Sequence, residues 1–195
     1  TPLLDRAVQA LACALTASLF LVAAARADGA YSFETTPGKL PKTVVPIHYA
    51  LDLQPDLEKL ALAGSMVVDI EVREPTDRLV LNAINMTFAS ATIDGVGPAG
   101  NISIDKDAQT VTLTFPRPIG VGQQKLRIAY AGEIYKNGRG MYLIDYRTDD
   151  GRKKMIASHF EPTDARRVFP GWDEPAFKAT FDVRMTVPQQ FLAVS

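Results

Sequence analysis

The residues that could do chemistry in this 195-residue chain gather between Ser158 and Phe181. This segment holds one of the two histidines, the only tryptophan, and four carboxylates interleaved with two arginines: His159, Trp172, Glu161, Asp164, Asp173, Glu174, Arg166 and Arg167. A carboxylate at the mouth of a loop is well placed to bind a ligand, because loops on a rigid scaffold supply many binding residues. Alternating acids and arginines also form ion pairs that pin a loop. The residue types alone favour the second interpretation, because they complete no catalytic constellation.

The elements around this segment are expected to be a strand end, a loop and a returning strand. Pro162 lacks a backbone donor and favours an extended Glu161, so the first strand is expected to end there. Residues 163–167 are compatible with one helical turn, with Thr163 as its N-cap. From Thr180 onward apolar and polar residues alternate again, which predicts a strand. Glu161 is therefore expected at the mouth of a loop between two strands.

Short alternating runs make up most of the remaining sequence. Apolar residues recur at every second position in several segments, among them 45–53, 66–72, 111–115 and 126–130. Turn residues separate these runs, and no segment sustains the period of a helix. The predicted fold is all-β, an antiparallel β-sandwich or a set of saddle-like curved sheets. The net charge of −1 and the lack of a basic cluster argue against a nucleic-acid partner.

Residues 1–27 have the pattern of a helical secretory signal peptide. Arg6 precedes an apolar run over residues 7–25, and small residues at positions 25 and 27 offer a cleavage site. The run is nearly long enough to span a bilayer, so an uncleaved membrane anchor is the alternative. Both interpretations predict export, as a periplasmic, secreted or membrane-anchored protein. The single cysteine, Cys13, lies in this run, so the mature chain is expected to contain no disulfide.

Two further segments complete the predicted domain organisation. Residues 28–42 include many Gly, Pro, Thr and Ser residues, and they are predicted to form a linker or extended arm. Residues 43–195 are predicted to form the β domain and are numerous enough for one hydrophobic core. The last predicted strand should pair onward, so this domain is expected to be incomplete at its C-terminus.

Four ungapped motifs occupy the segment 158–181. They are His159-Phe160-Glu161, Ala165-Arg166-Arg167, Phe169-Pro170-Gly171-Trp172-Asp173-Glu174-Pro175 and Phe177-Lys178-Ala179-Thr180-Phe181. With Pro46-Ile47-His48-Tyr49 and Gly140-Met141-Tyr142 upstream, they resemble the N-terminal domain of aminopeptidase N-like zinc metallopeptidases, the gluzincin aminopeptidase family. The resemblance covers about residues 40–195, nearly the whole chain after the signal segment. It implies a fragment truncated before the catalytic domain.

The resemblance also implies a site for the free N-terminus of a peptide substrate. It assigns Glu161 to the α-amino group, and it places His159 where the family usually has a glutamine that lines the substrate site. Zinc and the general base are implied in a following thermolysin-like domain of the same polypeptide. This chain has no His-Glu-x-x-His sequence, so no catalytic residue and no metal ligand is assigned within it. The chain alone is therefore expected to be inactive, as the capping domain of an exported zinc metalloaminopeptidase, a hydrolase of N-terminal peptide bonds.

The remaining charged residues of the segment are assigned to loop architecture: Asp164, Arg166, Asp173 and Glu174. Two other functions compete with the peptidase interpretation. One is a non-catalytic secreted β-sandwich that acts as a binding or interaction module, including a pseudoenzyme. The other is an unrelated exported β-sandwich that binds carbohydrate or protein, which would require a stripe of exposed aromatic residues. The aromatic residues mostly fall on apolar strand faces, and the length of the motif match favours the peptidase.

Overall fold

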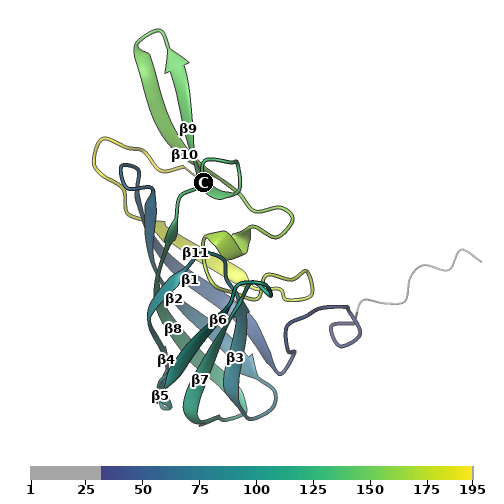
Figure 1. Cartoon of the computed structure of the whole chain (residues 1–195). Coiled ribbons are helices and arrows are strands. Elements are labelled where there is room, and N and C mark those ends of the chain that lie inside the picture. Colours follow the sequence, from purple (N-terminus) through teal and green to yellow (C-terminus); the bar gives the residue numbers. More distant parts are fainter. Residues whose placement is uncertain (1–31, 195) are drawn as a thin grey trace, which may run out of the picture. The chain divides into compact units, whose positions relative to one another are not determined.

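The structure, a computed structural model, describes residues 32–194 (Figure 1). The predicted helical signal peptide over residues 1–27 lies outside this range. Within it, the regular elements are β1 (Val44–Asp56), β2 (Ala61–Val72), β3 (Thr76–Asn82), β4 (Thr87–Ile93), β5 (Gly97–Pro98), β6 (Asn101–Asp105), β7 (Thr110–Ile119), β8 (Gly122–Glu133), β9 (Gly140–Thr148), β10 (Gly151–His159), the 3₁₀ turn η1 (Ala165–Arg167) and β11 (Thr180–Met185). The predicted all-β class is confirmed for these residues, and none of their elements is a helix that could cross a membrane.

The largest sheet has the strand order β11-β1-β2-β8-β4-β5. Its long strands β1, β2 and β8 alternate between buried residues and more exposed ones. Because side chains of a strand point to opposite faces in turn, this alternation puts one face of the sheet against the core. Leu51 of β1, Met66 of β2 and Ile128 of β8 form one row across the sheet, and all three are buried.

A three-stranded sheet in the order β3-β7-β6 shares its core with the larger sheet. Fully buried side chains come from both sheets, including Leu62, Val68 and Ile70 from the larger one and Leu81, Val111 and Leu113 from the smaller one. The strands β9 and β10 pair only with each other, and this hairpin stands apart from both sheets in Figure 1. The base of the hairpin leads directly into the loop that carries Glu161.

One strand pairing departs from the predicted antiparallel arrangement. β11 runs parallel to β1, whereas the other strand pairs among the described residues are antiparallel. A period-two pattern determines which face of a strand is buried, but it does not specify the direction of the neighbouring strand. The long connection over residues 160–179 returns the chain to the edge of β1 in the same direction, as parallel pairing requires.

The apolar face of β11 lies at the edge of the largest sheet and is exposed. Phe181, Val183 and Met185 are 49%, 59% and 36% exposed. Their register partners on β1 are buried, as Leu51 opposite Val183 illustrates. The apolar inner surface of the sheet therefore continues past the edge of the core.

Residues 33–42, predicted to belong to a linker or extended arm, are docked on the domain. Leu40 is buried, and Phe33 packs against the hydrophobic core. The Lys42 ammonium donates hydrogen bonds to three backbone carbonyl oxygens of the same segment. A carboxylate oxygen of Glu174 accepts the backbone N–H of Leu40 at 3.1 Å. The described part of the arm is thus held in place by specific contacts.

Candidate functional site

Arg166 ties the loop between β10 and β11 to the body of the domain. The residue is only 9% exposed. Its Nε donates to Asp173 Oδ2 at 2.8 Å, and its Nη2 donates to the backbone carbonyl oxygen of Asp173 at 2.8 Å. Its Nη1 donates to Gln109 Oε1 at 3.3 Å. A buried charge is tolerated when it is paired and hydrogen-bonded, and this arrangement meets both conditions.

A second ion pair holds the turn η1. Arg167 Nε donates to Asp164 Oδ1 at 2.7 Å, and the Arg167 guanidinium lies 5.1 Å from the centroid of the Tyr135 ring. Burial is the largest single influence and lowers the pKa of Arg167, but the interactions with Asp164 and Tyr135 together outweigh it and raise this pKa above its ordinary value. The N-cap of the turn is Asp164, so the prediction of Thr163 was wrong. The Asp164 carboxylate makes no capping bond, because it is engaged by Arg167.

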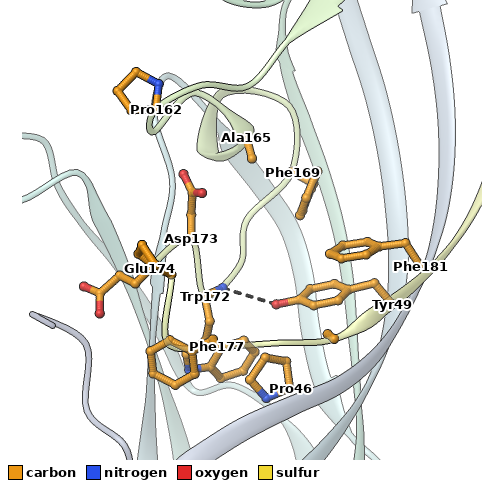
Figure 2. Close-up of a pocket in the computed structure, with 12 residues that line it drawn as sticks. Pro46, Tyr49, Pro162, Ala165, Phe169, Trp172, Asp173, Glu174, Phe177 and Phe181 are labelled. Carbon is orange, nitrogen blue, oxygen red and sulfur yellow. Dashed lines mark hydrogen bonds between the residues drawn. The ribbon is translucent and has the colours of Figure 1, made fainter. Parts of the chain in front are cut away.

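The returning part of the loop is held by backbone hydrogen bonds and a buried hydroxyl. Asn82, the last residue of β3, exchanges two backbone hydrogen bonds with Gly171, at 2.8 and 3.1 Å. The Tyr49 hydroxyl accepts the backbone N–H of Trp172 at 3.2 Å, the dashed line in Figure 2. Burial raises the pKa of Tyr49, which keeps this hydroxyl protonated. Trp172 is 6% exposed and belongs to the hydrophobic core.

Aromatic side chains around Tyr49 line a hollow of about 260 Å³, and Figure 2 shows these lining residues. Phe181 stacks on Tyr49 with ring centroids 4.8 Å apart and planes inclined by 6°. Phe169 meets the same tyrosine edge-on at 5.8 Å. Neither His159 nor Glu161 lines this hollow. We interpret it as the packing layer beneath the loop.

His159 and Glu161, the two predicted substrate-binding residues, line a different hollow of about 410 Å³. We call it the Glu161 hollow, and its lining residues are Ile84, Gln109, Asn137, Gly138, Arg139, His159, Glu161, Pro162, Thr163, Asp164 and Arg167. Both predicted residues are exposed. The structure therefore brings them together on one surface, at the point where the hairpin ends and the loop begins.

The charged side chains of the Glu161 hollow fall into two groups. Asp164 and Arg167 pair with each other. Glu161, His159 and Arg139 make no side-chain hydrogen bond or ion pair with any residue in the range 32–194. The hollow thus offers one unpaired carboxylate, one unpaired guanidinium and one imidazole to a ligand.

Sequence reasoning missed the loop over residues 135–140, which forms part of this wall. Gly138 and Gly140 have φ values of 74° and 60°, a conformation that glycine adopts without strain. A Cβ atom on Gly140 would lie 2.8 Å from Cβ of Arg167, so only glycine allows this close approach. The loop therefore packs against η1 and places Arg139 on the wall of the hollow. The Asn-Gly pair within it is a recognisable turn signal, but such a signal does not reveal what the turn packs against.

The described residues do not fit the zinc ion that the family resemblance implies. No group of three or more His, Cys, Asp or Glu side chains within residues 32–194 could hold a metal. A protein zinc site uses three or four such ligands. His48 instead engages β11, since its Nδ1 lies 2.7 Å from Thr180 Oγ1 and its Nε2 lies 3.4 Å from Asp182 Oδ2.

Comparisons with known proteins give a family match over most of the chain. Residues 45–195 match the Peptidase M1 N-terminal domain. The chain is 42% identical to aminopeptidase N of Acetobacter pasteurianus over 182 residues, which cover 93% of this chain and 51% of that protein. It is 34% identical to aminopeptidase 2 of Candida albicans over 157 residues, covering 80% of this chain and 17% of that protein. It is also 34% identical to endoplasmic reticulum aminopeptidase 1 of Homo sapiens, covering 87% of this chain and 19% of that protein. The chain thus spans about half the length of the first relative and less than a fifth of the other two.

Proposed function

Because this chain belongs to the family of Peptidase M1 N-terminal domains, we propose that it is the substrate-capping domain of an exported zinc aminopeptidase. The whole enzyme removes residues from the free N-terminus of peptides. In this proposal, as the family resemblance implies, the zinc ion and the general base belong to a thermolysin-like domain of the same polypeptide. The relatives named above support the peptidase class.

The observation that carries this proposal is the unpaired Glu161 carboxylate on a loop that is otherwise pinned by ion pairs. Asp164, the other carboxylate of the hollow, is engaged by Arg167. A charge-assisted hydrogen bond between Glu161 and an α-ammonium group is strong where water is excluded. A peptide with a blocked N-terminus leaves that carboxylate desolvated and unpaired, which is unfavourable. Glu161 thereby selects free N-termini.

His159 lies beside Glu161 in the same hollow and completes the proposed substrate surface. Its imidazole can accept or donate a hydrogen bond, as the glutamine amide usual at this position also can. We assign it to substrate contact, with no part in proton transfer.

The proposed enzyme acts outside the cytoplasm, in the periplasm or as a secreted protein. The support is the basic flank, apolar run and small-residue cleavage pattern over residues 1–27. N-terminal sequencing of the protein recovered from the exported fraction tests this. A mature terminus near Asp28 is expected, whereas a membrane-bound protein that retains residues 1–27 would indicate an uncleaved anchor.

The first test is the Glu161→Ala substitution in the full-length polypeptide that carries this chain. The transition-state stabilisation, obtained from kcat/KM for an alanine anilide, is expected to fall by about 2–4 kcal/mol. This is the range for removing one partner of a buried charge pair. The matched control is Glu58→Ala, which removes an exposed carboxylate that does not line the Glu161 hollow. The control is expected to keep wild-type kinetics.

Two outcomes would contradict the proposal at different levels. Wild-type kinetics in Glu161→Ala would remove the assigned role of this carboxylate while leaving the peptidase class intact. A full-length protein that hydrolyses no aminoacyl anilide, even when supplied with zinc, would favour the alternative of a non-catalytic secreted binding module.

A further inference from the structure

The hairpin register brings Arg139 next to the Glu161 segment. Gly140, the first residue of β9, is paired with His159, the last residue of β10. Arg139 immediately precedes this pair on one strand, and Glu161 follows it by two positions on the other. Arg139 and Glu161, which are distant in sequence, therefore both lie at the base of the hairpin, and both line the Glu161 hollow.

The loop that carries Arg139 is closed and supported. The backbone N–H of Tyr135 donates to the carbonyl oxygen of Met141 at 2.8 Å, and the N–H of Leu143 donates to the carbonyl oxygen of Tyr135 at 2.8 Å. The close approach of Gly140 to Arg167 fixes the far side of the loop. These contacts restrain the backbone that presents Arg139, so its position on the wall follows from the fold.

The charges on this wall are complementary to a ligand that carries both signs. Asp164 and Arg167 neutralise each other, whereas Glu161 and Arg139 have no partner within the described residues and form no ion pair with each other. We propose that Arg139 is a specificity-determining residue that binds the side-chain carboxylate of a substrate whose first residue is Asp or Glu. This inference rests on the proposed function, in which Glu161 binds the α-ammonium group of the same residue.

The chemistry of the two groups explains why acidic first residues are preferred. A guanidinium donates two parallel hydrogen bonds to a carboxylate, a geometry that lysine does not match. An N-terminal Asp or Glu offers an ammonium to Glu161 and a carboxylate to Arg139 at once. An N-terminal Lys or Arg would bring a second positive charge toward Arg139, which is unfavourable. The hollow of about 410 Å³ lies within the size range of small-molecule sites.

The test compares three substrates with the full-length enzyme and its Arg139 variants. The substrates are the anilides of glutamate, alanine and lysine, assayed by kcat/KM. In Arg139→Gln, the ratio of glutamate to alanine hydrolysis is expected to fall about three- to tenfold, the size of a partly exposed charge interaction. In Arg139→Glu, the preference is expected to shift from glutamate to lysine. Arg139→Lys is expected to retain part of the glutamate preference.

The matched control is Lys136→Gln, which removes an exposed positive charge from the same loop outside the Glu161 hollow. Its substrate ratios are expected to equal those of the wild type, which separates a local contact from a general change in charge. Unchanged ratios in Arg139→Gln, with alanine anilide still hydrolysed, would overturn the inference while the proposed function stands. Absence of hydrolysis by the wild type would instead refute the proposed function, and wild-type kinetics in Glu161→Ala would refute the assigned role of Glu161. The inference would fall in either case.

Discussion

Two neighbouring regions of this domain use their charged residues in opposite ways. In the loop after β10, Arg166 pairs with Asp173 and Arg167 pairs with Asp164, and all four side chains are between 10% and 19% exposed. At the rim of the Glu161 hollow, the charged side chains are exposed and unpaired. A charge removed from water must be neutralised inside the protein, whereas a charge left in water stays available to a ligand. Pairing therefore separates the residues that build the loop from those that can recognise a substrate.

The largest expected effect comes from breaking the paired region. Arg166→Ala leaves the half-buried Asp173 without its partner and is expected to lower the free energy of unfolding by about 3–5 kcal/mol. Glu161→Ala, measured in the same urea titration of this chain, is expected to change it by less than about 0.5 kcal/mol. Equal destabilisation by the two substitutions would erase the distinction between the regions.

A smaller effect is expected at the rim, where His159→Gln puts an amide in the place of the imidazole. A glutamine amide can donate and accept hydrogen bonds as an imidazole can, so it can keep the proposed substrate contact. The variant is expected to keep the wild-type unfolding free energy and a kcat/KM for alanine anilide within about two- to threefold of the wild-type value. His159→Ala, which removes the contact, is expected to lower kcat/KM further. Wild-type kcat/KM in His159→Ala would show that this side chain does not contact the substrate.

The smallest effect is expected for an exposed ion pair. It tests whether pairing without burial also stabilises the fold. Arg127 Nε donates to Asp94 Oδ1 at 3.1 Å, and this hydrogen bond lowers the pKa of Asp94. Because the folded-state pKa is lowered, the pair stabilises the fold above the ordinary pKa of the carboxyl group and ceases to do so as the pH falls through the lowered value. Asp94→Asn is therefore expected to shift the urea midpoint slightly at neutral pH and not at all in strong acid. A shift that persists in acid or in high salt would contradict an electrostatic origin.

The long strands β1, β2 and β8 could be predicted because each buries one face. Within the predicted alternation of residues 45–53, Tyr49, Leu51 and Leu53 share a face and are buried. Ile47, predicted on the same face, is 39% exposed, because the register with β2 shifts between Pro46 and His48. The partner of each strand could not be predicted, because hydrogen bonding between strands involves backbone groups common to all residues. This is why the parallel pairing of β11 with β1 became visible only in the structure.

The candidate site could be described from the sequence only where its residues are close together in the chain. The motif between His159 and Glu174 identified both the candidate ligand groups and the loop architecture, and Arg166 and Asp173 form the ion pair expected of such a loop. Arg139 was not found, because its place on the hollow depends on the hairpin register and on the absence of a side chain at Gly140. The identity of residue 139 predicts neither the hairpin register nor the close packing at Gly140.

The docked arm shows a similar limit. Residues 33–42 have the composition of a linker, and composition reports the average behaviour of a segment rather than individual contacts. The Lys42 ammonium accepted by three carbonyl oxygens and the Glu174 carboxylate bound to backbone N–H groups are single interactions. Each requires two particular groups to meet, which only the folded chain determines.

The exposed apolar row on β11 bears on how readily copies of this chain associate with one another. Phe181, Val183 and Met185 lie on an edge strand, where unpaired backbone groups are available to another chain. An exposed edge with apolar side chains is a surface on which copies of a protein join strand to strand. We therefore expect this edge to limit the solubility of the chain when it is produced by itself, and we expect a charged residue in place of Val183 to raise that solubility.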